Sequence, residues 1–187
     1  MHVHNYDPTQ GQAFQGDVSI IPIPSDIAIA TTDEIKPIDN KLILQEGELT
    51  GHHHHIVLPS RNFRPAAATV GDGILNVRDT TLRKKFFGGG KVKMKDLTDA
   101  IAHTPTAHLY RDPAAVQTLA TKPYKAPNGE MIPILTRTDL AVGCLVIEGD
   151  GMPVKHQEHD AITIPPGNYL IGRQIESAGA EERVVAD

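Results

Sequence analysis

Proline and glycine are spread along the whole chain and limit the length of any regular element. The 187 residues include 16 glycines and 14 prolines. Both residue types interrupt helices, and proline cannot donate a hydrogen bond inside a sheet. Between them lie short segments rich in Ile, Val and Leu, such as residues 140–148 and 168–175. The pattern predicts a mainly β fold, a small barrel or sandwich, rather than a helical bundle.

A chain of this length forms one domain, or one domain with an insertion. Residues 1–15 are polar and lack periodicity, so we expect an N-terminal arm there. A single β-rich domain is expected over residues 16–176, interrupted by an irregular, partly helical insertion at about residues 61–128. Residues 177–187 are polar and are expected to form a tail.

Two short helices are predicted inside the insertion. Asp112 followed by Pro113 is typical of a helix start, and this helix should run to Ala120. Asp96 resembles the cap of another helix, ending near His103 before the next proline. These two helices are the helical part of the predicted insertion.

Histidines gather in two places that lie far apart along the chain. His52 to His55 are consecutive and internal, and His156-Gln157-Glu158-His159 follows in the last third. Side chains alternate between the two faces of a strand. His52 and His54 therefore share a face with Ile56 and Leu58, which predicts that these two histidines point inward.

Neutral imidazole is the commonest metal ligand in proteins. We predict that His52, His54, His156 and His159 together bind one divalent metal ion, with zinc expected from the nitrogen donors. Four protein ligands would indicate a structural site, whereas three ligands and an open position would indicate catalysis, with Glu158 as general base. The pattern leaves this choice open. The alternative is an exposed polar stretch of histidines without a metal.

Glu46 and Glu48 precede the first histidine cluster. A ligating histidine usually donates its second N–H to a carboxylate or carbonyl, so these acids are candidates to orient the ligands from behind. The alternative is that both belong to a solvated turn.

Basic residues gather inside the predicted insertion, although the chain as a whole has a net charge of -5. Such a patch can bind an acidic protein surface or the phosphates of a nucleic acid. The alternative interpretation is that these residues form a solvated hairpin without a partner. The candidate partner-binding residues are Arg83, Lys84, Lys85, Lys91, Lys93 and Lys95.

The chain resembles a family of small, uncharacterised proteins of bacteria and their phages. The family pairs a GE-x-TGH-x-H segment with a later H-x-EH segment, which is followed by I-x-LPxG-x-Y and a last strand containing glutamine. The matching segments here are Gly47-Glu48-Leu49-Thr50-Gly51-His52-His53-His54 and residues 156–169, and the opening Gln15-Gly16-Asp17-Val18 is also similar. The resemblance brings no established activity.

A second resemblance is to cupins, β-barrels that hold a metal through an H-x-H pair and a further histidine. His52-x-His54 and the turn at Ile164-Pro165-Pro166-Gly167 look like parts of that pattern. In cupins the further histidine follows such a turn, whereas here His156 and His159 precede it. This resemblance implies a metal-dependent oxygenase.

Two functions follow from these patterns. The first is a non-enzymatic structural or assembly protein, such as one of a phage particle, in which the histidine site joins two halves of the domain and the protein forms a homo-oligomer or larger assembly. The second is a metal-dependent hydrolase or cupin-like oxygenase. The sequence shows neither a membrane span nor a signal-peptide core, so we expect a cytoplasmic protein, or a virion protein if a phage encodes it.

Overall fold

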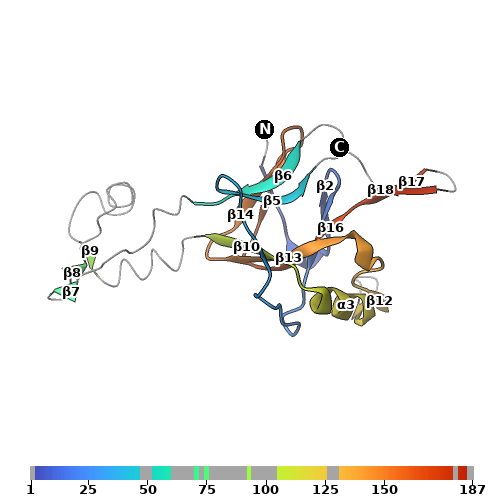
Figure 1. Ribbon diagram of the computed structural model, residues 1–187, viewed down its shortest axis with the longest axis horizontal. Coiled ribbons are helices and arrows are strands. Elements are labelled where there is room, and N and C mark those ends of the chain that lie inside the picture. Colours follow the sequence, from blue (N-terminus) through green and yellow to red (C-terminus); the bar gives the residue numbers. More distant parts are fainter. Residues whose placement is uncertain are drawn as a thin grey trace.

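The computed structural model is mainly β, as predicted, with two sheets packed face to face as a sandwich (Figure 1). The structure describes residues 3–46, 52–59, 70–71, 74–75, 92–93, 105–125, 131–178 and 181–184.

The first sheet has five strands and carries both histidine segments. Its order is β1 (Val3–Asn5), β15 (Ala161–Ile164), β14 (Met152–Lys155), β6 (His53–Val57) and β5 (Lys41–Glu46). The β1–β15 pair is parallel, and the other pairs are antiparallel. Because β6 pairs with β14, the first histidine run is brought beside the loop that holds the second.

The second sheet has six strands, and all of its pairs are antiparallel. Its order is β2 (Ala13–Gln15), β3 (Val18–Pro22), β16 (Gly167–Arg173), β13 (Ala141–Glu148), β10 (Thr106–Tyr110) and β4 (Glu34–Ile35).

The main core lies between the two sheets and follows the two-residue alternation of the strands. Leu145 and Ile147 of β13 are buried there with Ile56 of β6 and Val154 of β14. The cluster is aliphatic apart from the ring of Tyr169, which is consistent with the low aromatic content of the chain.

A helix covers the outer face of the six-stranded sheet. This helix, α3 (Pro113–Thr121), is the one predicted from Asp112 and Pro113. Its residues Ala115 and Leu119 pack in a second core against Cys144 and Leu170, which point outward from β13 and β16. Residues 141–147 of β13 are apolar because this strand is covered on both faces, and the strand ends at the exposed Glu148.

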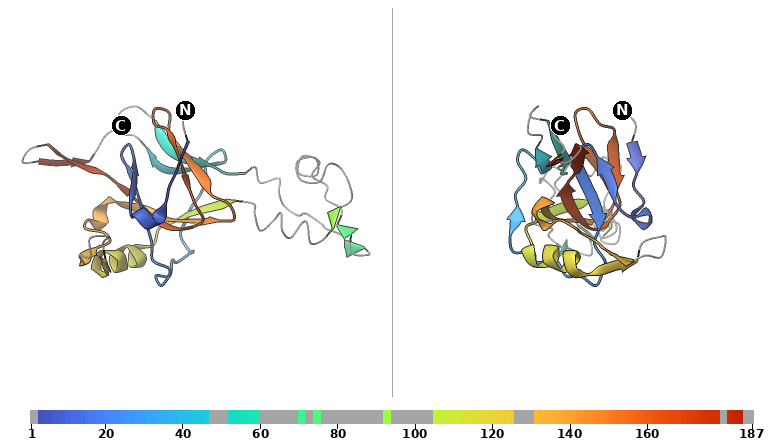
Figure 2. Two further views of the ribbon diagram at one scale, coloured as in Figure 1. Left: turned by 180° about the vertical axis from the view of Figure 1, so that it is seen from behind. Right: turned by 90° about the vertical axis from the view of Figure 1, so that its right-hand side faces the viewer.

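Several smaller elements surround the sandwich (Figure 2). Two are short 3-10 turns, η1 (Pro8–Gln10) and η2 (Thr138–Leu140). The remaining strands form β11 (Pro123–Lys125) with β12 (Met131–Pro133), β17 (Ile175–Ala178) with β18 (Glu181–Val184), and a small sheet of β7 (Val70–Gly71), β8 (Ile74–Leu75) and β9 (Val92–Lys93).

The predicted boundaries need three corrections. Residues 3–15 are not a separate arm, because β1 joins one sheet and β2 the other. The predicted insertion, residues 61–128, includes β10, which lies inside the six-stranded sheet. The predicted tail, residues 177–187, contains most of the β17–β18 hairpin. The β1 strand was missed because it is three residues long and its partner lies far away in the sequence, whereas β2 and β17 are short strands that pair with their neighbours along the chain.

Some predictions lie outside the described residues. These are the helix from Asp96 to His103, the acid Glu48, and five of the six basic candidates, Arg83, Lys84, Lys85, Lys91 and Lys95. Lys93 is the described member of that group and belongs to β9. None of the helices that the structure describes has the length and apolar composition needed to span a bilayer.

Candidate functional site: a buried histidine cluster

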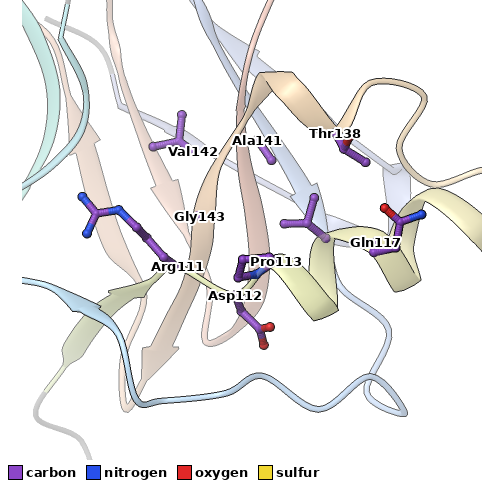
Figure 3. A pocket seen from close by; sticks show the side chains of 9 residues that line it. Arg111, Asp112, Pro113, Gln117, Thr138, Ala141, Val142 and Gly143 are labelled. Carbon is purple, nitrogen blue, oxygen red and sulfur yellow. The ribbon is translucent and has the colours of Figure 1, made fainter.

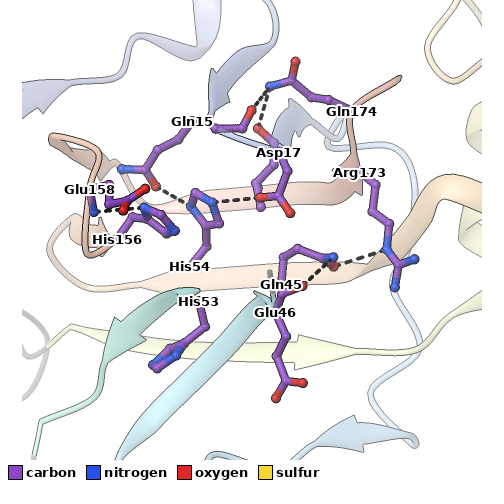
Figure 4. A network of polar contacts seen from close by, with 12 residues as sticks. Gln15, Asp17, Gln45, Glu46, His53, His54, His156, Glu158, Arg173 and Gln174 are labelled. Carbon is purple, nitrogen blue, oxygen red and sulfur yellow. Dashed lines mark hydrogen bonds and ion pairs between the residues drawn. The ribbon is translucent and has the colours of Figure 1, made fainter. Parts of the chain in front are cut away.

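His54 is the most enclosed member of the candidate site. It lies on β6 with 0% of its surface exposed. Its Nε2 lies 2.8 Å from Oδ1 of Asp17, and its Nδ1 lies 3.1 Å from Oε1 of Gln15 (Figure 4). Gln15 and Asp17 flank the turn between β2 and β3, so the imidazole of one sheet is held by side chains of the other.

The neighbours of Gln15 fix the proton on Nδ1 of His54. The Nε2 of Gln15 donates to the carbonyl of Asp160 at 2.6 Å, and it approaches the carbonyl of Val154 at 3.4 Å. The amide oxygen must therefore be the atom that faces His54, and Nδ1 must donate to it. Nε2 faces the carboxyl group of Asp17. At 2.8 Å the Nε2 of His54 and the Oδ1 of Asp17 share one proton, which lies on one or the other of these two buried atoms.

His156 stacks directly on His54. The ring centroids are 4.2 Å apart and the planes differ by 19°. The backbone N–H of Glu158 donates to Nδ1 of His156 at 3.2 Å. That nitrogen must carry a lone pair, so the hydrogen bond selects the neutral imidazole.

The other two predicted ligands join the same group. The ring of His159 is nearly parallel to that of His156, with centroids 4.6 Å apart, and lies 6.0 Å from that of His54. His52 meets His156 edge to face at 5.8 Å. The structure thus brings together all four histidines that the sequence singled out. We call His52, His54, His156 and His159 the histidine cluster.

The rings of the cluster differ in orientation. Those of His54, His156 and His159 are nearly parallel, whereas His52 meets His156 edge to face. Within the described part of the chain, no group of three or more His, Cys, Asp or Glu side chains is placed to hold a metal ion. Zinc binding at the histidine cluster stays a prediction.

The remaining histidines of the first run face the other side of β6. His53 and His55 lie beside each other with ring centroids 4.7 Å apart, and both are partly exposed. Burial lowers the pKa of His55, which favours its neutral form. The alternation predicted for the run is present, although the side chain of His52 at its start remains 30% exposed.

The two predicted acids lie at the margin of the cluster. Glu158 places Oε1 3.5 Å from Nδ1 of His52, and its side chain is 59% exposed. Glu46 is exposed and lies opposite His53 in the β5–β6 register. Its side chain points away from His54 in Figure 4.

Three residues that hold the cluster were not predicted as site residues: Gln15, Asp17 and Gln174. Gln174 fixes the β2–β3 turn, since its Nε2 donates to the carbonyl of Gly16 at 2.6 Å and its backbone N–H to that of Asp17 at 2.7 Å. Their positions depend on contacts between distant segments, which no local pattern in the sequence indicates.

A cavity of about 450 Å³ lies elsewhere, beside the start of α3 (Figure 3). Arg111, Gln117 and Thr138 supply polar groups to its wall. The carboxylate of Asp112 also lines it, but that group accepts hydrogen bonds from three backbone N–H groups, those of Ala30, Ala114 and Ala115. Asp112 thus serves to cap the helix.

Comparison with known proteins adds no assignment to this geometry. No family model, no curated protein and no solved structure matches the chain.

Proposed function

We propose that this chain is a non-enzymatic structural or assembly protein in which the histidine cluster fastens the two sheets of the sandwich together. The observation that carries the proposal is the position of His54. It belongs to the five-stranded sheet, yet both of its nitrogens face side chains of the β2–β3 turn in the six-stranded sheet. A buried side chain that contacts both sheets in this way fixes their relative position.

The loop between β14 and β15 adds a third segment to the contacts that join the two sheets. His156 and His159 of this loop stack on His54, and the carbonyl of Asp160 accepts from Gln15. Breaking a buried pair of ionisable groups by removing one partner is costly, because the other group stays behind without compensation. The contacts therefore favour one relative placement of the sheets and this loop.

A zinc ion at His52, His54, His156 and His159 is the second part of the proposal. It is supported by the shared location of four imidazoles from two distant segments. The side chain that would serve as a catalytic base, Glu158, is mostly exposed and contacts the outermost histidine. This arrangement favours a structural role for the ion.

The experiment combines sedimentation velocity and urea unfolding on untagged protein. We expect the sedimenting mass to increase with concentration, and we expect His54→Ala to lower the free energy of unfolding. His4→Ala is the matched control, because that side chain is 69% exposed and lies 3.9 Å from its nearest acid. A protein that stays monomeric at all concentrations, binds no acidic or viral partner and tolerates His54→Ala as well as His4→Ala would contradict the proposal.

A further inference from the structure

The β17–β18 hairpin stands away from the sandwich (Figures 1 and 2). Its strands pair with each other, from Ile175 opposite Val184 to Ala178 opposite Glu181. Among the described strands neither has another partner. A lone two-stranded hairpin is only marginally stable in water, and both of its outer edges offer unpaired backbone groups. The hairpin therefore needs a surface against which to pack.

The sandwich has an open groove on the side where β4 and β5 are the outermost strands of their sheets. The groove has a volume of about 580 Å³. Five aliphatic side chains line it, together with Gln45 and the charged groups of Lys36, Glu46 and Arg173; the aliphatic residues are Ile35, Ile38, Ile43, Leu44 and Val142. Ile38 at its rim is 63% exposed. An aliphatic groove between two strand edges suits an added strand or hairpin.

We propose that the β17–β18 hairpin of one copy of this chain occupies the β4–β5 groove of a second copy, and that the second copy returns the same contact. The groove and the hairpin are adjacent in each copy, because Arg173 lines the groove and β17 begins at Ile175. A two-fold exchange then places both contacts next to the symmetry axis and repeats each of them. The partner chemistry is thus a second copy of this chain.

The root of the hairpin opposes docking into its own groove. To fold back, the chain would have to reverse at Gln174. The backbone N–H of Gln174 is bonded to Asp17, and its side-chain amide to Gly16. These bonds hold the direction in which the hairpin leaves the body, and that direction is outward (Figure 2).

Charge supports the same partner. The hairpin sequence contains Glu176, Glu181 and Glu182 against a single Arg183. The groove presents the two basic residues Arg173 and Lys36 and the one acid Glu46, and Lys36 also pairs with Glu34. Opposite charges around an apolar contact raise the association rate and select the register. The inference rests on the proposed assembly role and names the contact through which copies associate.

The first experiment measures the dimer dissociation constant of the full chain by sedimentation equilibrium. Ile38→Glu changes a rim residue that is mostly exposed, so the monomer should still fold. Val57→Glu is the matched control, since Val57 is an aliphatic residue of β6 that is 44% exposed and lies outside the groove. We expect Ile38→Glu, and a chain ending after Gln174, to raise the dissociation constant about tenfold or more. Val57→Glu should leave it unchanged.

The second experiment mixes the two defective chains. The chain ending after Gln174 keeps its groove and lacks the hairpin, whereas Ile38→Glu keeps the hairpin and has a damaged groove. Each should be monomeric alone, and the mixture should form a heterodimer through the one intact contact. Thermal unfolding of each chain by circular dichroism verifies that both are folded.

The outcomes separate this inference from the proposed function. A full chain that associates equally well without the hairpin overturns the exchange and leaves the assembly role in place. Absence of a heterodimer in the mixture also overturns the exchange. A full chain that is monomeric at every concentration, with hairpin amides protected from hydrogen exchange, would show docking within one chain and overturn the exchange as well. A monomer that in addition binds no partner would overturn both.

Discussion

His54 and Asp17 lie 2.8 Å apart at Nε2 and Oδ1 although they belong to different sheets. Removing either side chain leaves the other polar group buried without its main interaction partner. We expect His54→Ala and Asp17→Ala each to lower the free energy of unfolding by about 3 kcal/mol. Urea unfolding measures both values.

The double variant tests whether the two residues act as a pair. If they do, the double variant loses less free energy of unfolding than the two single variants lose in sum, and the difference is about 1 kcal/mol or more. Strict additivity would show that the contact contributes nothing to stability. His4→Ala, an exposed histidine, should stay within about 0.5 kcal/mol of the parent.

The predicted zinc ion is tested by elemental analysis of untagged protein. If one ion is shared by His52, His54, His156 and His159, then His54→Ala and His159→Ala should both reduce the metal content from about one ion per chain to near zero. A protein that is free of metal after purification in the presence of zinc would contradict the prediction.

His108→Ala is the control for metal binding. His108 lies on β10 and contacts Glu34 at 2.7 Å, outside the histidine cluster. Its replacement should leave the metal content unchanged. Loss of metal in one cluster variant but not in the other would show that the four histidines do not share an ion.

Asp112 should make the stability of α3 depend on pH at the acid end. Burial raises the pKa of Asp112, but hydrogen bonds from the backbone N–H groups of Ala30, Ala115 and Ala114 outweigh it and hold the pKa below its ordinary value of 3.8. Because the pKa of Asp112 is lower in the folded state than in the unfolded state, ionisation of this carboxyl group stabilises the folded protein above pH 3.8. This stabilisation is lost as the pH falls through the pKa of the folded state.

We therefore expect Asp112→Ala to cost about 1–2 kcal/mol at neutral pH and progressively less in acid. Asp112→Asn keeps one side-chain oxygen acceptor without the charge, so its cost should be smaller. Urea unfolding from neutral pH to below 3.8 measures the difference. A cost that does not change with pH would contradict the role of the ionised carboxylate.

Cys144 should be unreactive in the folded protein. It is fully buried between β13 and α3. Burial, and next the negative charge of Asp112, raises the pKa of its thiol to about 11. The reactive thiolate is therefore scarce at pH 8, and reagent cannot reach it. Iodoacetamide should label Cys144 only in urea, and labelling of the native protein at the rate of a free thiol would contradict the packing.

The sequence predicted those features that depend on local rules. The helix after Asp112 follows from a cap and a proline that act on their own neighbours. The inward position of His54 follows from strand alternation beside Ile56. The apolar run that ends before Glu148 could be assigned as a buried strand because two covered faces leave no polar positions within it.

Features that depend on distant partners were missed. Asp17 lies after a glycine in a polar context, which is typical of an exposed turn, and its burial results from His54 on the other sheet. The β1 strand is three residues long, and its pairing with β15 has no local signature. The orientation of the rings in the histidine cluster likewise depends on distant contacts, those of Gln15 with His54 and of the backbone of Glu158 with His156.

The parallel pairing of β1 with β15 also has a consequence during synthesis. Neither the pairing of Val3 with Ala161 nor the hydrogen bond from Gln15 to Asp160 can form until the ribosome has made the chain through residue 161. Contacts between residues so far apart slow folding, since a long loop must close before any of them forms. Until then β1 lacks the strand with which it pairs, so the five-stranded sheet is among the last parts of the fold to be completed.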